Sequence, residues 1–294
     1  MTFEKLSEPL TFTNPMKTFR FGVIADCQYD GLNGEPNSTG TRFCVSALGK
    51  LQDAGAELNR HELDFVINLG DLIDRQFENF PEPLKVLLGL RAPLYHLVGN
   101  HDFCGPDYEY AVTPREEIFR ILDLQNPYYS WNQNGWKFIV LDTNEVGTIE
   151  WPPGTPQYDE GAKVLSEMKE AGAINSRPWN GGLSEEQFAW LEKELESETP
   201  TIVFGHHPIS PDYGGNCLND KQLRALLQKS SQVKAYFCGH EHAGMFDQFI
   251  DLPCLAFKGM VETKDENTFA VVTLDGDKID IQGFGREESR VLKR

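Results

Sequence analysis

Short apolar runs that end in polar residues recur along this chain. The five clearest runs span residues 21–25, 65–70, 93–98, 201–205 and 235–239. Patterns typical of helices lie between several of them, at about 41–60, 81–90, 184–195 and 220–229. This alternation of strand and helix predicts parallel βαβ units. Because the runs are continuously apolar, we expect helices to cover both faces of the sheet structure.

The middle and the end of the chain have a different pattern. Residues 128–131 and 136–141 flank a polar turn and predict an antiparallel hairpin. Apolar runs at 254–257, 269–274 and 279–283 follow one another without a helical pattern between them. Two packed mixed β-sheets flanked by helices would use all of these elements, so the predicted fold class is α/β.

The distribution of proline and glycine suggests how the chain is divided. Residues 1–17 are polar and contain prolines, which favours an N-terminal tail or edge segment. Residues 18–294 are expected to form a single domain, since α/β folds of roughly 250 residues often do so. Residues 144–182 are rich in Pro, Gly and Trp and contain a short helical pattern near 161–171. We interpret them as an insertion, and insertions of this length are usually functional or disordered.

Seven residues able to bind metal follow the five apolar runs. They are Asp26, Gln28, Asp71, Asn100, His206, His240 and His242. In an extended chain residues i and i+2 point the same way, so each pair separated by two positions is expected to bind one centre together. Asp71 supplies a carboxylate that could bridge two cations. Since ligands of α/β sheets gather beyond the carboxyl ends of the strands, the pattern predicts a two-metal hydrolytic site there.

The net charge of the chain limits which binding partners are expected. The chain of 294 residues has 45 acidic and 27 basic residues, a formal net charge of -18 and a pI near 4.8. Duplex DNA and anionic membranes are therefore excluded as expected partners, because binding to them draws on Lys and Arg. A small anionic substrate is compatible with this charge if metal ions supply positive charge locally.

Cysteine spacing and hydropathy suggest the compartment. Six cysteines, at 27, 44, 104, 217, 238 and 254, lack Cys-x-x-Cys spacing and are expected to be buried, reduced thiols. The first residues lack the basic start and apolar core of a signal peptide, and no apolar run approaches the ~20 residues that span a bilayer. We therefore expect a soluble, cytoplasmic protein. The oligomeric state is not predicted.

The joint order of the polar motifs is more specific than any one of them. Asp-x-Gln, Gly-Asp-x-x-Asp, Gly-Asn-His-Asp, Gly-His-His and Gly-His-x-His follow one another in the chain. From residue 19 to about 290 the sequence resembles the calcineurin-like metallophosphoesterase superfamily. Within it, the chain is most similar to manganese-dependent ADP-ribose/CDP-alcohol diphosphatases, which also carry Gln in the first motif. That similarity extends to Gly181-Gly182-Leu183-Ser184, His207-Pro208-Ile209 and Gly283-Phe284-Gly285-Arg286.

The resemblance implies two divalent metal ions that share Asp71. One would be held by Asp26, Gln28, Asp71 and His242, and the other by Asp71, Asn100, His206 and His240. Gln28 stands where many relatives have His, and oxygen ligands favour Mn²⁺ or Mg²⁺ over Zn²⁺. We therefore expect Mn²⁺, with Fe, Zn or Mg as alternatives.

The resemblance also implies catalytic and substrate-binding residues. His101 would approach the leaving-group oxygen as a general acid, and Asp74 would orient it. Arg75 is a candidate phosphate clamp, although a solvated surface Arg fits its pattern equally well. Arg42 belongs to the matching segment Gly40-Thr41-Arg42 and is a second candidate for substrate binding. Just before it, Pro36 and Ser38 stand where those diphosphatases tend to carry aromatics.

Other polar and aromatic residues near the motifs have plainer interpretations. His207 and Glu241 alternate with candidate ligands, so the strand pleat should turn them away from the metals. Asp142 is expected to cap a turn. Among the aromatic residues of the insertion, Trp179 is expected to pack it against the domain, while Trp151 and Tyr158 could pack or could stack on a nucleobase.

The leading hypothesis is a dinuclear metal-dependent hydrolase that cleaves a pyrophosphate or phosphodiester bond in small nucleotide conjugates such as ADP-ribose or CDP-alcohols. The alternative within the superfamily is a phosphomonoesterase or a cyclic-nucleotide phosphodiesterase. A non-catalytic interaction module is an alternative of another class. It predicts eroded ligands, whereas all seven candidates and the His101/Asp74 pair are present.

Overall fold

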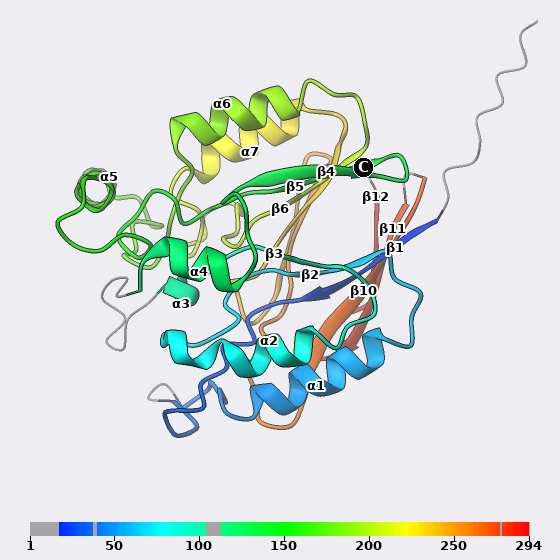
Figure 1. The fold of residues 1–294 in the computed structure, drawn as a ribbon. Coiled ribbons are helices and arrows are strands. Elements are labelled where there is room, and N and C mark those ends of the chain that lie inside the picture. The colour runs from blue at the N-terminus through cyan, green and yellow to red at the C-terminus, as the bar shows by residue number, and fades with distance from the viewer. Residues whose placement is uncertain (1–17, 38–39, 104–112, 277, 294) are drawn as a thin grey trace, which may run out of the picture.

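Two β-sheets face each other in a computed structural model of the chain, which describes residues 18–37, 40–103, 113–276 and 278–293 (Figure 1). In the described part, the first sheet has the order β12-β11-β10-β1-β2-β3 and the second β4-β5-β6-β7-β9-β8. The strands of the first are β1 (Phe19–Ile24), β2 (Phe65–Asn68), β3 (Leu94–His96), β10 (Thr268–Asp275), β11 (Lys278–Gly285) and β12 (Arg290–Lys293). Those of the second are β4 (Tyr129–Gln133), β5 (Trp136–Val140), β6 (Thr201–Phe204), β7 (Val233–Cys238), β8 (Met245–Phe249) and β9 (Leu252–Ala256).

Helices cover the outer faces of both sheets. In Figure 1, α1 (Ala47–Leu58) and α2 (Pro81–Leu87) lie below the first sheet, while α6 (Glu185–Glu194) and α7 (Asp220–Lys229) lie above the second. The short α3 (Asn100–Phe103), α4 (Arg115–Ile121) and α5 (Pro156–Glu170) lie on the left side of the same view. A single 3-10 turn, η1 (Phe77–Asn79), precedes α2.

Three apolar layers hold this arrangement together. The central layer lies between the sheets and contains stacked rings such as Phe21 and Phe65, whose centroids are 4.8 Å apart. A second layer lies between the first sheet and α1 and α2, and a third between the second sheet and α6 and α7. The predicted α/β fold with two packed mixed sheets is therefore confirmed.

Strand direction brings the candidate residues to one region. In the first sheet β1, β2 and β3 are parallel, and in the second sheet β5, β6, β7 and β9 are parallel. Parallel strands place their carboxyl ends at the same edge of a sheet. The seven candidate ligands follow β1, β2, β3, β6 and β7, so they are delivered by the loops of both sheets.

Several predicted boundaries are wrong for reasons of tertiary structure. The helix expected from 41 begins at Ala47, because Phe43 N donates to Val261 O at 2.9 Å and Arg42 forms a β-bridge with Glu262. The helical pattern expected from 161 begins at Pro156, where the Thr155 side chain accepts a hydrogen bond from Tyr158 N. Strands β8 and β12 were not predicted, since Met-Phe-Asp-Gln-Phe and Arg-Val-Leu-Lys neither alternate in polarity nor form a continuous apolar run.

The remaining expectations concern the cysteines, the division into domains and membrane-spanning segments. Five cysteines, at 27, 44, 217, 238 and 254, are buried and free as predicted, while Cys104 and the segment 1–17 lie outside the described residues. The single-domain assignment of 18–294 with an insertion at 144–182 stays a prediction. No helix within the described ranges has the length and apolar character that crossing a membrane requires.

Candidate metal centre

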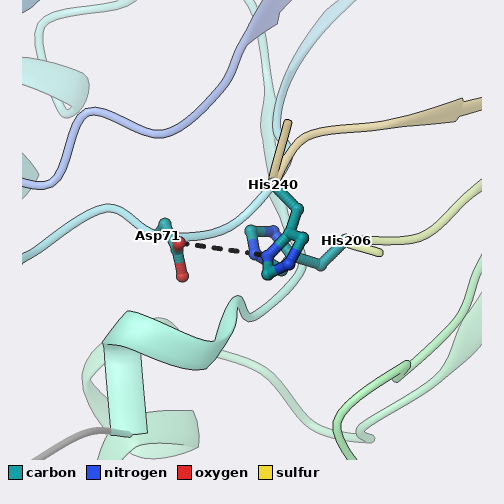
Figure 2. A group of neighbouring side chains, drawn as sticks. All are labelled: Asp71, His206 and His240. Atoms are coloured by element: carbon teal, nitrogen blue, oxygen red, sulfur yellow. Dashed lines mark hydrogen bonds and ion pairs between the residues drawn. The ribbon is translucent and has the colours of Figure 1, made fainter. Parts of the chain in front are cut away.

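The seven candidate ligands converge on one place. The ligand atoms of Asp71, His206 and His240 lie within 4.8 Å of one another, and so do those of Asp26, Asp71 and His242. Asp71 belongs to both groups. Figure 2 shows the first group, with His206 and His240 directed toward Asp71 and a distance of 3.4 Å between His206 Nε2 and Asp71 Oδ2.

Each group is extended by one amide side chain. Asn100 Oδ1 lies 3.1 Å from His206 Nε2 and 3.0 Å from His240 Nδ1. Gln28 Nε2 lies 3.0 Å from Asp71 Oδ2 and 3.1 Å from His242 Nε2. The structure thus brings together the two sets that the resemblance implied. The expectation from spacing that His240 and His242 serve one centre together is wrong, because they lie in different groups.

Several candidate ligands lie where the backbone leaves the extended conformation. Asp26, Gln28, Asp71 and His240 have φ values of 49°, 45°, 53° and 67°. These residues are therefore in left-handed conformations beyond the strand ends, where the alternation of an extended strand does not apply. Left-handed non-glycine residues are uncommon, and they cluster at functional sites where surrounding contacts hold them in place.

Glycines leave room for the close approach of these loops. A Cβ on Gly99 would lie 2.1 Å from Asp71 Oδ1, and a Cβ on Gly239 would lie 2.6 Å from Asp26 Oδ2. Since real Cβ atoms do not come so near, any side chain at either position would displace a carboxylate. Geometry thus explains why glycine, and no larger residue, precedes Asn100 and His240.

The donor set fits divalent cations. Gln28 Oε1 is buried and has no hydrogen-bond partner among the described residues, so it is available as a ligand. Burial by itself lowers the pKa of His206, but the nearby Asp71 carboxylate outweighs burial and raises it to about 9. His242 behaves alike: its hydrogen bonds to Asp26 and Glu262 outweigh burial and raise its pKa to about 9. Each of the two ligand groups therefore provides an environment that favours positive charge. The oxygen and imidazole donors of both groups suit Mn²⁺, Fe or Zn²⁺.

His101 and Asp74 form a hydrogen-bonded pair beside the cage. His101 Nδ1 lies 2.6 Å from Asp74 Oδ1, and His101 N donates to Asp71 Oδ1 at 2.7 Å. Since a carboxylate accepts hydrogen bonds, this contact places the ring proton on Nδ1, and Nε2 accepts from Arg42 Nη1 at 3.1 Å. Asp74 is completely buried.

The two candidate arginines lie in different places. Arg42 Nη1 lies 3.1 Å from His101 Nε2, and Arg42 lines the cleft over the cage. Arg75 instead contacts Asp74 Oδ2 through Nε and Nη2, both at 3.2 Å, and lines a separate smaller cavity. The structure therefore brings Arg42, and not Arg75, to the place where a substrate would meet His101.

Two carboxylates near the cage were missed by the sequence analysis. Asp102 accepts hydrogen bonds from Asp71 N, Leu72 N, Ile73 N and Gly99 N, and so joins the loops after β2 and β3. Its place in Gly-Asn-His-Asp was a signal that could have identified it. Glu262 Oε1 lies 2.9 Å from His242 Nδ1 and orients that ring, but no motif marks it.

A cleft of about 830 Å³ opens over the cage. The candidate ligands Gln28, Asp71, Asn100, His240 and His242 line it together with His101, Arg42 and Glu262. Its other lining residues are Ile149, Arg177, Pro178, Trp179, Tyr213, Gly214, Gly215 and Glu241. The cleft therefore extends from the candidate ligands to the insertion and to the loop at 213–215.

Some expectations for the surrounding residues are confirmed and others are wrong. Asp142 caps a turn as predicted, since its Oδ1 accepts from Asn144 N. His207 is turned to Thr143 and Trp179 O, while Glu241 lines the cleft and accepts a hydrogen bond from Tyr213. Trp179, which was expected to pack the insertion against the domain, is 47% exposed and lines the cleft, so its packing role stays a prediction.

Comparisons with known proteins agree with this geometry. Residues 19–244 match the family model described as calcineurin-like phosphoesterase. The chain is 27% identical to the manganese-dependent ADP-ribose/CDP-alcohol diphosphatase of Homo sapiens, over 94% of this chain and 93% of that protein. It is 28% identical to the protein of the same name from Arabidopsis thaliana, over 79% of this chain and 82% of that protein.

A solved structure has the same fold. The crystal structure of a dimetal phosphatase from Danio rerio superposes with a TM-score of 0.83 at 21% identity, over 95% of this chain and 99% of that chain. The family match covers most of the described chain and all seven candidate ligands. The chain therefore belongs to the calcineurin-like phosphoesterase family, as the resemblance predicted, and is a metal-dependent hydrolase of phosphoric esters or anhydrides.

Proposed function

We propose that this protein hydrolyses a pyrophosphate or phosphodiester bond in small nucleotide conjugates, with two manganese ions. The observation that carries the proposal is the pair of ligand groups that share Asp71 beneath a cleft into which His101 faces. A protein that had lost catalysis would have no need to keep His101 paired with a buried carboxylate at 2.6 Å.

We assign the ligands as the two groups suggest. Asp26, Gln28, Asp71 and His242 would hold one ion, and Asp71, Asn100, His206 and His240 the other. When bound, two such cations lower the pKa of water and neutralise charge on a phosphoryl group. Three amide or carboxylate residues in the first set favour Mn²⁺ as the resident metal, in line with the manganese dependence in the relatives' names.

The chain's own residues orient the substrate and move a proton. Asp74 would stabilise the imidazolium form of His101, whose Nε2 then donates a proton to the leaving oxygen. Arg42, whose Nη1 donates to that nitrogen without substrate, would instead donate to the phosphoryl oxygens, which leaves Nε2 free to carry the proton. We assign Arg75 to holding Asp74 and not to binding phosphate, because its guanidinium group contacts that carboxylate.

The substrate class rests on the relatives' names and on the cleft. Those names specify ADP-ribose and CDP-alcohols, and a cleft of about 830 Å³ is in the range of pockets that hold small-molecule ligands. Phosphomonoesters and cyclic nucleotides are the alternative substrates. The cytoplasmic location stays a prediction.

A substrate screen on protein of assayed metal content tests the proposal. ADP-ribose, CDP-choline, a cyclic nucleotide and p-nitrophenyl phosphate would be compared with added Mn²⁺, Mg²⁺ or Zn²⁺. We expect ADP-ribose or CDP-choline to be hydrolysed with the highest kcat/KM, and with Mn²⁺. Activity toward p-nitrophenyl phosphate alone would defeat the diphosphatase assignment.

His101→Ala tests the catalytic assignment. We expect about 10²- to 10⁴-fold lower kcat with unchanged manganese content, because removal of a general acid has effects of this size. His61→Ala is the matched control, since His61 lies in a different cavity beside Glu57. Unchanged rates in the His101 variant would remove that residue from the mechanism.

A further inference from the structure

The side wall of the cleft presents an aromatic face. Trp179 lines the cleft and is 47% exposed, although burial of a Trp side chain is normally favourable. The Arg177 guanidinium carbon lies 6.0 Å from the ring centroid, and Arg177 lines the same cleft. An exposed indole with a cation beside it is a surface suited to planar, electron-rich rings.

Three hydrogen bonds hold the segment that carries this ring. Trp179 O accepts from His207 Nε2 at 3.2 Å, and Pro178 O accepts from Thr148 Oγ1 at 3.2 Å. Asn180 Nδ2 donates to Gly214 O at 2.8 Å, across to the loop that forms the neighbouring wall. The ring therefore projects from a fixed segment, which reduces the entropy that a ligand would otherwise lose in ordering it.

We propose that Trp179 is the stacking surface for the nucleobase of the substrate, with Arg177 beside it. This inference rests on the proposed function and names which part of the nucleotide the insertion recognises. The candidate ligands line the same cleft, so one substrate could place its base on Trp179 and its phosphates at the cage. Stacking uses the face of the base, which explains how one site can serve both the purine and the pyrimidine conjugates named for the relatives.

Binding of AMP in the presence of Mn²⁺, measured by calorimetry, tests this subsite without turnover. We expect about tenfold weaker binding in Trp179→Ala and in Trp179→Leu, since stacking contributes roughly 1 to 3 kcal/mol per base. Trp179→Phe should stay within about threefold of the unaltered protein, because it keeps a ring. The control is Phe246→Ala, which removes a ring that is 41% exposed on β8 and outside the cleft.

A selectivity measurement completes the test. The ratio of kcat/KM for ADP-ribose to that for P1,P2-dimethyl diphosphate, which has no ring, should fall about tenfold in Trp179→Ala and Trp179→Leu. An unchanged ratio would overturn the proposed nucleobase subsite. So would a loss of AMP affinity that also occurs in Trp179→Phe. If Trp179→Ala fails to fold, the AMP affinities of Trp179→Phe and Trp179→Leu are compared instead.

The two proposals can fail separately. If the protein binds AMP through Trp179 but does not cleave ADP-ribose, the diphosphatase assignment fails and the subsite stands. If it cleaves ADP-ribose while all Trp179 variants bind AMP equally well, the subsite fails and the diphosphatase assignment stands. Absence of AMP binding to the manganese-loaded protein would also overturn the subsite.

Discussion

Two buried histidines outside the candidate ligand set are held neutral by their surroundings. His207 lies between Thr143 and Trp179 O, and burial lowers its pKa to about 3. His96, at the end of β3, is also buried, and burial lowers its pKa to about 4. Asn68 Nδ2 lies 3.4 Å from His96 Nδ1, which can accept only while it is unprotonated.

His96 should therefore make the fold sensitive to acid. Its pKa in the unfolded chain is about 6.5, so between pH 6.5 and pH 4 the unfolded state binds the proton and the folded state does not. Stability is lost as pH falls through this window, by about 1.4 kcal/mol per pH unit at most. Urea unfolding at several pH values should show a shallower loss in His96→Gln. Parallel curves for the two proteins would contradict the prediction.

At the scale of elements, the loops after the strands depend on glycine. The loops after β2 and β3 meet where Asp102 accepts from Asp71 N and Gly99 N. Gly99 leaves the space that the Asp71 carboxylate occupies, since a Cβ there would lie 2.1 Å from Asp71 Oδ1. The position of the shared ligand thus depends on a residue without a side chain.

Gly99→Ala should consequently disrupt the cage more than the fold. We expect loss of manganese binding and of activity, because the methyl group must displace Asp71. Gly49→Ala is the matched control: Gly49 lies in α1 with nothing within 4 Å of an added Cβ. In a helix this change should stabilise the protein by about 0.5 to 1 kcal/mol. Calorimetric manganese titration and urea unfolding would measure both, and full metal affinity in Gly99→Ala would refute the argument.

At the scale of the molecule, loops from both sheets build the cage. Asp26, Gln28, Asp71 and Asn100 follow strands of the first sheet, while the three candidate histidine ligands follow strands of the second. Bound cations would therefore link sheets that otherwise meet through the apolar layer between them. The site and the fold should be thermodynamically coupled.

Manganese should therefore raise the stability of the whole molecule. At a concentration of 100 times Kd, we expect each bound ion to add about 2.7 kcal/mol to the free energy of unfolding, since it binds the folded state. Chelation should remove this gain, and Asp71→Asn should reduce it strongly because both ions lose the shared carboxylate. Thermal unfolding with and without Mn²⁺ measures the effect. An equal gain in Asp71→Asn would show that the ions bind elsewhere.

The sequence by itself determined the strands and helices with long apolar patterns, the fold class, and the residue types of the cage. These follow from local periodicity and from motif order, so α7 at 220–229 was predicted without error. Tertiary structure decided how the candidate ligands are grouped: His240 and His242 fall in different groups, whereas Asp26 and Gln28 fall in the same one. It also brought Glu262, Arg42 and Trp179 together in one cleft. Their contacts join segments far apart in the chain, and no local pattern records which segments meet.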